Sequence, residues 1–375
     1  MTELPGIDVE TVELRRIELP LVTPFRTSAG TWSERDVLLV RVLGDGVEGW
    51  GECVAPGDPS YSPEYTAGAH AVAGDHLLPR LFAAGVRHAA DVAGALEGVR
   101  GHAMAKAAIE AAVLDAELRA AGRGLAEHLG AARDRVPVGV AVGMLPLDEL
   151  VATVARHLDE GYARVKVKVG PGWDVEPCRR LRAELGDGFG LQVDANGAYG
   201  LGDLDTFRAL DDLGLLLIEQ PFPEHRLLDH AELATAIDTP VCLDESIVDQ
   251  DVLDDVLRLG AADVVAIKPG RVGGHLAGRR MHDRCVAAGV PLWHGGMLET
   301  GIGRAANLAL AALPGFTLPG DISAADRYWR QDIVTEPAVL EADGTIRVPS
   351  GPGTGVEVDR AVLESVTTSV ELHRR

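Results

Sequence analysis

A (β/α)7β TIM-like barrel with an α+β capping domain is the fold that three observations predict for this 375-residue chain. First, eight short apolar runs recur at regular intervals from Val136 onward, with helical stretches between several of them. Second, residues 1–132 contain runs that alternate apolar and polar side chains, as antiparallel strands do. Third, the βα rhythm stops after residue 325, so residues 326–375 are expected to pack back on the capping domain.

The eight runs predict parallel strands, because most are followed by enough residues for a crossover helix. The last run lacks a normal closing helix, so the expected catalytic barrel at residues 133–325 is (β/α)7β. A doubly wound open sheet is the alternative that the same alternation permits. The runs are 136–142, 163–169, 190–195, 215–220, 240–245, 263–269, 290–295 and 316–321.

The N-terminal region predicts an α+β domain. Residues 11–19 and 35–44 alternate as antiparallel strands, and a glycine-rich turn is expected at 44–51. Residues 103–122 predict a long amphipathic helix. Near the other end of the chain, residues 346–358 offer a strand and loops that could return to this domain.

The composition limits the partners of the protein. Its 57 acidic and 35 basic residues give a formal charge of −22, so nucleic acid and anionic membranes would be repelled. The sequence has neither an apolar segment long enough to span a membrane nor a secretory leader, and we expect a cytoplasmic protein. The four cysteines form no CxxC pair, which predicts buried free thiols rather than a zinc knuckle or disulfides.

Two lysines are expected inside the barrel. Side chains alternate along a strand, so if the valines of 163–169 face the surrounding helices, Lys166 and Lys168 point inward together. The alternative is a surface edge strand with solvated lysines. Valine on the opposite face favours a strand that helices cover.

Three carboxylates end successive strands. Asp194, Glu219 and Asp244 are separated by 25 residues each, which is one βα unit. Strand ends converge at the carboxyl rim of a barrel, where catalysis takes place. Converging like charges need a cation between them, and oxygen ligands favour Mg²⁺ or Mn²⁺. Taken singly, each acid could instead cap a helix or end a strand.

Lys268 ends the next strand and is expected to face Lys168 across this arc of acids. Nearby positive charges help an ammonium group release its proton, so the two lysines and a metal ion could together keep one amine neutral as a base. Arg271 follows closely and would add to that effect, unless it is a solvated loop residue.

At these residues the sequence resembles the enolase superfamily over essentially its whole length. The KxK pair at 166–168 and the motifs DAN (194–196), IEQP (218–221), LDES (243–246) and IKPGRVGG (267–274) resemble the muconate-cycloisomerase-type group. Residues 23–32, 295–307 and 317–327 are similar to the branch of o-succinylbenzoate synthases and N-succinylamino acid racemases. The chemistry that this resemblance implies is a Lys or His base with Mg²⁺ stabilising an enediolate.

The resemblance implies a role for each matching residue. Asp194, Glu219 and Asp244 would bind Mg²⁺, with Mn²⁺ or another divalent cation able to replace it, and Lys168 and Lys268 would be the acid/base pair. Around them, the supporting or substrate-contacting residues would be Lys166, Asn196, Glu245, Arg271, Gly296, Met297 and Glu299. Loops at 24–31 and 53–60 would cap the barrel mouth, while His294 is expected to have a packing role.

The implied reaction begins with removal of a proton next to a substrate carboxylate. It would be the dehydration of 2-succinyl-6-hydroxy-2,4-cyclohexadiene-1-carboxylate to 2-succinylbenzoate, a menaquinone precursor, together with N-succinylamino acid racemisation. A dedicated racemase, a dipeptide epimerase, a muconate cycloisomerase and an inactive carboxylate-binding barrel are the alternatives. The sequence leaves open which reaction is physiological and which homo-oligomer forms.

Overall fold

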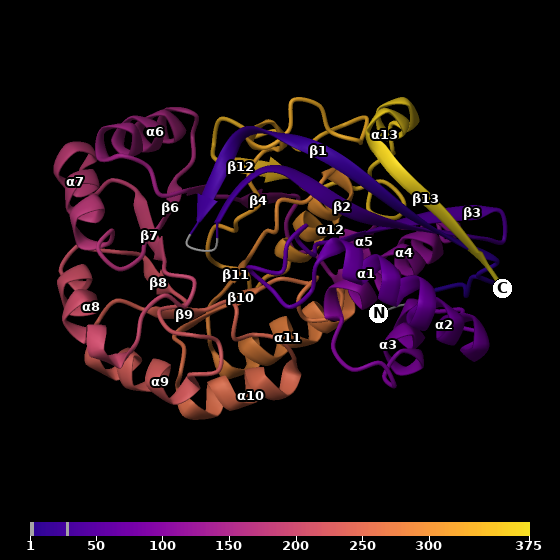
Figure 1. The fold of residues 1–375 in the computed structure, drawn as a ribbon, viewed down its shortest axis with the longest axis horizontal. Helices are drawn as coiled ribbons and strands as arrows, with labels where there is room; N and C mark the ends of the chain where they lie inside the picture. The colour runs from indigo at the N-terminus through magenta and orange to yellow at the C-terminus, as the bar shows by residue number, and fades with distance from the viewer. Residues whose placement is uncertain (1–3, 28–29) are drawn as a thin grey trace.

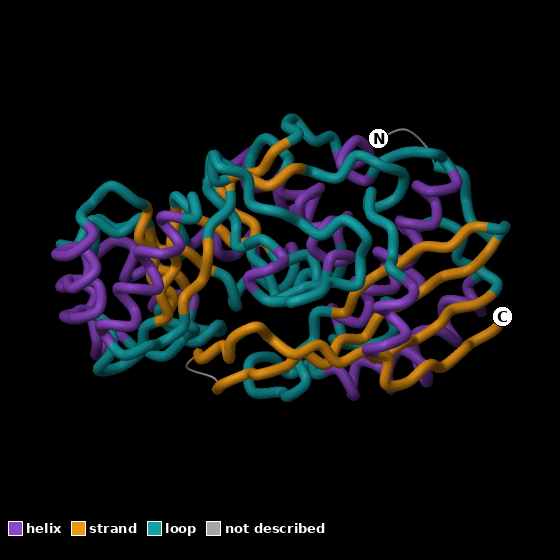
Figure 2. Tube along the Cα trace, turned by 90° about the horizontal axis from the view of Figure 1, so that it is seen from above, coloured by secondary structure: helices purple, strands orange, loops and turns teal. Residues whose placement is uncertain are grey.

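The protein contains a parallel barrel sheet and a separate antiparallel sheet. The computed structural model describes residues 4–27 and 30–375, and Figures 1 and 2 show the two sheets side by side. The barrel sheet has the strand order β11-β10-β9-β8-β7-β6-β5, and the second sheet has the order β13-β1-β2-β3. The predicted barrel with an α+β capping domain is therefore confirmed.

The barrel strands are short and almost completely buried, as expected for strands covered by helices on one face and by the barrel interior on the other. They are β5 (Val140–Val142), β6 (Arg164–Lys168), β7 (Gly190–Asp194), β8 (Leu217–Glu219), β9 (Val241–Leu243), β10 (Val264–Ile267) and β11 (Leu292–His294). The helices that follow them are α6 (Leu147–Asp159), α7 (Val175–Leu185), α8 (Leu204–Asp211), α9 (Leu227–Ala236), α10 (Gln250–Leu259), α11 (His275–Ala288) and α12 (Gly301–Ala311).

The eighth run closes the barrel through single bridges rather than as a regular strand. Phe316 forms a parallel bridge with Leu292 of β11, and Gly320 forms one with Val138 beside β5. The Asp321 amide also donates to the His294 carbonyl at 2.8 Å. Both edges of the seven-stranded sheet are thus bonded to one segment, and the open-sheet alternative is wrong.

The first run, 136–142, is split, so its prediction as one strand is wrong. Its first part, β4 (Arg135–Pro137), pairs antiparallel with β12 (Thr345–Arg347), and only β5 joins the barrel. Gly139 lies between the two parts. A Cβ atom at this position would lie 2.3 Å from Nε of Arg164, so only glycine lets the chain pass that buried guanidinium.

The capping sheet consists of β1 (Thr11–Thr27), β2 (Gly30–Gly44), β3 (Val47–Cys53) and β13 (Thr367–Arg374). The predicted glycine-rich turn is much shorter than 44–51: only Asp45 and Gly46 form it, both with positive φ. Gly49 and Gly51 are strand residues. A Cβ on either would come within 2.2 Å of a backbone oxygen of α4, so these glycines permit close packing of helix on strand.

Helix α4 (Ala103–Ala120) is buried on nearly all sides, which corrects the prediction of an amphipathic helix. It packs on β3 with one face and contacts α11 of the barrel with another. Its small alanine side chains make both close approaches possible. Around it lie α1 (Thr66–Val72), a π-helical turn (Ala73–Leu77), α2 (Leu78–Ala84), α3 (Ala89–Ala95) and α5 (Leu125–Leu129).

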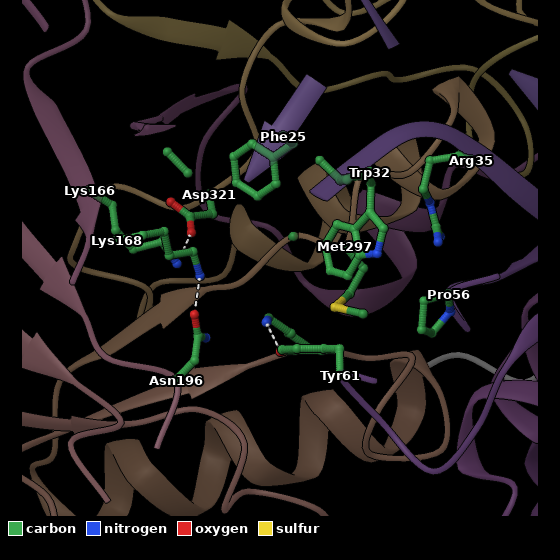
Figure 3. A pocket seen from close by; sticks show the side chains of 14 residues that line it. Phe25, Trp32, Arg35, Pro56, Tyr61, Lys166, Lys168, Asn196, Met297 and Asp321 are labelled. Atoms are coloured by element: carbon green, nitrogen blue, oxygen red, sulfur yellow. Dashed lines mark hydrogen bonds and ion pairs between the residues drawn. The ribbon is translucent and has the colours of Figure 1, made fainter. Parts of the chain in front are cut away.

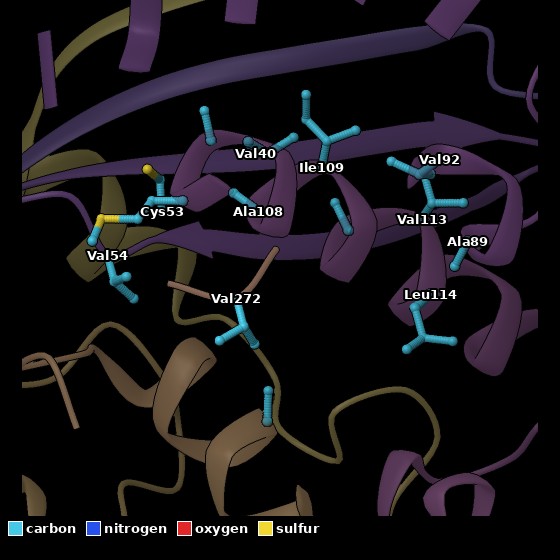
Figure 4. Packing of buried hydrophobic residues seen from close by; sticks show 14 of the residues in the cluster. Val40, Cys53, Val54, Ala89, Val92, Ala108, Ile109, Val113, Leu114 and Val272 are labelled. Atoms are coloured by element: carbon cyan, nitrogen blue, oxygen red, sulfur yellow. The ribbon is translucent and has the colours of Figure 1, made fainter. Parts of the chain in front are cut away.

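One hydrophobic core joins the cap to the barrel. Val40 and Cys53 of the capping sheet, Ile109 of α4 and Val272 of the barrel belong to one buried cluster. Figure 4 shows α4 between the capping strands and the loop that carries Val272. The four cysteines are buried and unpaired as predicted, and none of the helices in the described ranges is long and apolar enough to cross a membrane.

The C-terminal segment returns to the cap, but not through the expected strand. The predicted 346–358 segment contributes only β12, which pairs with β4 rather than with the capping sheet. The contact with the cap comes from β13, which follows α13 (Arg360–Val366) and pairs antiparallel with β1. The sheet thereby gains its edge strand from the far end of the sequence.

Candidate active site

Lys166 and Lys168 lie inside the barrel, as predicted. Strand β6 is bonded on both sides, to β5 and to β7, so the edge-strand alternative is wrong. Both lysines are buried and line one pocket, where Figure 3 shows their side chains pointing the same way. Burying two ammonium groups is costly unless carboxylates compensate them.

The three predicted carboxylates supply that compensation. Asp194 and Glu219 are register partners at the ends of β7 and β8, and Asp244 directly follows β9. Lys166 Nζ lies 3.1 Å from Asp194 and 3.0 Å from Glu219, and Lys168 Nζ lies 2.6 Å from Asp194. Burial acts to raise the pKa of Asp194, but the two lysines outweigh it and the pKa is lowered. Burial, together with Asp194, holds the pKa of Glu219 well above its usual range.

Asp321 is a fourth buried carboxylate at this rim, and the sequence reasoning missed it. Its side chain contacts Lys166, and its other oxygen lies 2.5 Å from Arg164. These two cations lower its pKa despite its burial, so the carboxylate is ionised. The available signal was its place at the end of the eighth run, where the carboxyl ends of the other strands already carry acids.

Lys268 and Arg271 share one carboxylate. Lys268 Nζ lies 2.7 Å from Oδ2 of Asp244, and Arg271 lies 2.6 Å from Oδ1. The Tyr61 hydroxyl, from the capping domain, accepts hydrogen bonds from Lys268 at 2.9 Å and from Arg271. Arg271 is buried, so the reading of a solvated loop arginine is wrong. Tyr61 was not predicted, because nothing in its sequence surroundings indicates which barrel loop it meets.

Asn196 and Glu245 form a chain of hydrogen bonds behind Lys168. Lys168 donates to Asn196 at 2.8 Å, and the Asn196 amide donates to Glu245 at 2.7 Å. The second carboxylate oxygen of Glu245 is buried without a partner among the described residues. Burial, with Asp244 and Asp194 nearby, raises the pKa of Glu245.

The pocket between these groups is closed by the cap. Phe25 and Trp32 stack with ring centroids 6.5 Å apart, and Trp32 meets Tyr61 edge-on. Phe25 of the predicted loop 24–31 and Pro56 of the predicted loop 53–60 line the pocket, so both loops reach the barrel mouth. Residues 28–29 of the first loop lie outside the described residues. The pocket is lined by Phe25, Trp32, Arg35, Pro56, Tyr61, Ala141, Lys166, Lys168, Asn196, Lys268, Gly296, Met297, Leu298 and Asp321.

The loop after β11 contributes two of the expected site residues to the pocket lining. Gly296 and Met297 line the pocket. Glu299 accepts a hydrogen bond from the Met297 amide at 2.9 Å and from Asn307 at 2.8 Å, so it holds this loop in place. His294 packs on Phe316, and burial lowers its pKa to about 3, which keeps the ring neutral.

The donor set fits a hard divalent cation, because Asp194, Glu219 and Asp244 offer only oxygen atoms. The buried, unpartnered oxygen of Glu245 adds a further uncompensated acceptor close by. Within residues 4–27 and 30–375, however, no three His, Cys, Asp or Glu side chains are grouped closely enough to form a metal site by themselves. Lysines balance the charge of these acids instead. Binding of one divalent cation by Asp194, Glu219 and Asp244 together stays a prediction.

Comparisons with known proteins agree with this geometry. The family model described as "Enolase C-terminal domain-like" matches residues 149–362, and the "Mandelate racemase / muconate lactonizing enzyme, N-terminal domain" matches residues 9–130. The chain is 55% identical to an N-succinylamino acid racemase of an Amycolatopsis species, over 96% of this chain and 97% of the relative. It is 43% identical to the o-succinylbenzoate synthase of Geobacillus kaustophilus, over 99% of both chains.

The solved structures give the same answer for the fold. A crystal structure of an enolase superfamily member from Listeria innocua superimposes with a TM-score of 0.93 at 35% identity. The match covers 98% of this chain and 99% of that one. Barrel, cap and returning C-terminal segment are therefore all shared with that structure.

Proposed function

Because the chain belongs to the enolase superfamily, in its muconate-cycloisomerase-type group, we propose that it is an o-succinylbenzoate synthase that also racemises N-succinylamino acids. The observation that carries the proposal is the placement of Lys168 and Lys268. Both ammonium groups line one pocket, and each is held by its own carboxylate.

The strand order supports opposed positions for the two lysines. Counting from β5, Lys168 ends the second strand of the barrel and Lys268 follows the sixth, with β7, β8 and β9 between them. In a closed barrel of eight segments, positions four strands apart lie on opposite sides. A substrate in the pocket would have its α-carbon between the two amines, so each amine would reach one face of that carbon.

In the proposed dehydration, Lys168 removes the proton next to the ring carboxylate and then returns it to the departing hydroxide, which leaves as water. Lys268 remains a cation and steadies the negative charge of the intermediate. In racemisation, one lysine removes the α-proton and the other delivers a proton to the opposite face. When bound by Asp194, Glu219 and Asp244, a divalent cation, Mg²⁺ or Mn²⁺, would supply positive charge beside the substrate carboxylate.

A dedicated N-succinylamino acid racemase is the second candidate, because the relative at 55% identity carries that name. The relative at 43% identity is named a synthase, and it matches the whole chain equally well. Both reactions need the same first step and the same residues. The remaining elements of the proposal are a cytoplasmic location, a role in menaquinone biosynthesis and a homo-oligomeric assembly.

The deciding experiment is a turnover screen of the purified protein with Mg²⁺. We expect dehydration of 2-succinyl-6-hydroxy-2,4-cyclohexadiene-1-carboxylate and racemisation of several N-succinylamino acids. Racemisation without dehydration would identify the dedicated racemase. Turnover of dipeptides or muconate alone would overturn the proposal in favour of those activities, and binding without any turnover would indicate an inactive barrel.

A further inference from the structure

Arg35, on strand β2 of the cap, is a buried cation whose head group is loosely held. It is 4% exposed, and among the described residues its guanidinium donates only to the carbonyls of Val54 and Ala55, at 3.3 and 3.4 Å. Its Nε is buried without a hydrogen-bond partner among the described residues. Such long contacts and an unused donor are costly for a buried charge.

The other buried arginines are held more tightly. Each donates to a carboxylate or carbonyl oxygen at 2.9 Å or less, namely Arg15, Arg164, Arg271 and Arg304. The Nε atoms of Arg164 and Arg304 are also unpartnered among the described residues, so the length of its contacts is what sets Arg35 apart. Arg35 has no carboxylate within ion-pair distance in the described part of the chain. The carboxylates that attract it from farther away are engaged elsewhere. Glu52 accepts from Thr300 and Gly303, Glu299 accepts from Met297, and Asp36 pairs with Arg16.

Arg35 also lines the pocket that contains the lysines. Figure 3 shows it on the far side of the pocket from Lys166 and Lys168, with Trp32 and Met297 drawn between them. The pocket therefore offers cations at one end, an apolar wall in the middle and a further cation at the other end. A ligand with two anionic groups joined by a short apolar chain matches this order.

We propose that Arg35 binds the carboxylate at the far end of the substrate's succinyl group. The inference rests on the proposed function, because both proposed substrates carry a succinyl carboxylate in addition to the carboxylate next to the reacting carbon. A planar guanidinium with unused donors suits a carboxylate, which can accept two parallel hydrogen bonds. Arg35 would then determine acyl specificity, because an N-acetyl group ends in a methyl and has no carboxylate to accept hydrogen bonds from the guanidinium.

The test compares N-succinyl- and N-acetylphenylalanine on the wild type and on Arg35→Met. Calorimetry gives the affinity for each ligand, and kinetics with Mg²⁺ separate KM from kcat. We expect Arg35→Met to weaken N-succinyl binding about 30-fold, as for loss of hydrogen bonds to a charged group. The KM should rise with little change in kcat, while N-acetyl binding should change less than about 3-fold. Arg35→Lys should restore part of the N-succinyl affinity.

Arg41→Met is the matched control, because Arg41 lies on the same strand and pairs with Glu13 and Glu48 instead of lining the pocket. It should leave both affinities within about 2-fold, as for a distant site. Equal losses for both ligands in Arg35→Met would mean that Arg35 only holds the loop at Val54 and Ala55, and would overturn the inference. Unchanged N-succinyl binding would do the same.

The calorimetric affinities test this inference independently of the proposed function. The wild type could turn over neither substrate and still bind N-succinylphenylalanine more tightly than N-acetylphenylalanine. If Arg35→Met then loses that preference, the role of Arg35 is supported and the proposed function fails. If the wild type binds both ligands with equal affinity, the proposed role of Arg35 is refuted, whether or not the protein turns over either substrate.

Discussion

Each lysine of the proposed acid/base pair has its own set of hydrogen-bond partners. Lys168 is held by Asp194 and Asn196, and Lys268 is held by Asp244 and Tyr61. These two sets have no member in common, so each side chain can be displaced without moving the other. Single substitutions should therefore separate their roles.

In deuterated water, Lys168→Ala should still allow α-proton exchange from one enantiomer of an N-succinylamino acid, and Lys268→Ala from the other. Neither variant should interconvert the enantiomers, because each keeps only one of the two bases. Dehydration should be lost in Lys168→Ala, and Lys268→Ala should remove the cation that steadies the intermediate. NMR of both enantiomers measures the exchange. Racemisation at the wild-type rate in either variant would contradict the two-base geometry.

Metal dependence is predicted from Asp194, Glu219 and Asp244. Chelation should abolish turnover, and Mg²⁺ or Mn²⁺ should restore it. Asp244→Asn keeps the shape of one ligand but removes its charge, so it should fold and bind Mg²⁺ about 10-fold or more weakly in calorimetry. Full activity of the metal-stripped wild type would refute the metal assignment, and unchanged Mg²⁺ affinity in Asp244→Asn would exclude this residue as a ligand.

Site residues at strand ends could be predicted, whereas those from the cap could not. The regular spacing of βα units is enough by itself to indicate that Asp194, Glu219 and Lys268 share a rim. Arg35 and Tyr61 come from a different sheet and a different loop, and only long-range packing brings them to that rim. Their local sequence carries no period that points to the pocket.

At the scale of elements, carboxylates of the cap hold the N-termini of barrel helices. Glu110 of α4 accepts from the amides of His275 and Leu276 at the start of α11, at 3.0 and 2.9 Å. Glu52 of β3 does the same for α12 through Thr300 and Gly303. Acids at helix N-termini are stabilising, and here they also join the two sheets. Burial raises the pKa of each carboxyl to about 7.

Glu110→Ala should lower the free energy of unfolding by about 1–3 kcal/mol, because two buried amides lose their acceptor. The raised pKa also predicts a pH effect. The folded protein holds this proton to about pH 7, whereas the unfolded chain releases it near 4.3, so this contribution to stability is present at low pH and is lost as pH rises from about 4.3 to 7.

Urea unfolding at several pH values from 5 to 8 measures both effects, and the stability of Glu110→Ala should depend less on pH than that of the wild type. Glu97→Ala is the control, because Glu97 is an exposed glutamate of the same domain. A pH dependence identical in Glu110→Ala and the wild type would contradict the assignment.

Helix α4 was predicted to be amphipathic, but it is buried on nearly all sides. An amphipathic helix would expose its charged residues, but Glu110, Asp115 and Glu117 are buried and each accepts hydrogen bonds from a neighbouring segment inside the protein. A sequence period distinguishes polar from apolar positions. It does not distinguish an acid in water from an acid that binds a buried amide.

At the scale of the whole molecule, the order of the barrel strands could be predicted from the sequence. The pairing of the C-terminal strand with the capping sheet could not. Eight runs in a βα rhythm permit few topologies, and the barrel is one of them. The pairing of β13 with β1 joins residues at least 350 positions apart, and no local pattern encodes it. The division of the chain at residues 132 and 325 stays a proposal that follows from this arrangement.

Removing residues 367–375 tests how far the site depends on that pairing. Strand β1 would lose its β13 partner, and Arg15 would lose its hydrogen bond to Thr367. Because β1 and β2 carry Phe25, Trp32 and Arg35 to the pocket, loosening of this sheet should raise KM while the barrel lysines keep their positions. We expect a melting temperature lower by about 5 °C and a clear loss in kcat/KM. Removal of Arg375 alone is the control and should leave KM unchanged. If the longer truncation keeps the wild-type KM and melting temperature, then β13 does not hold the cap over the site.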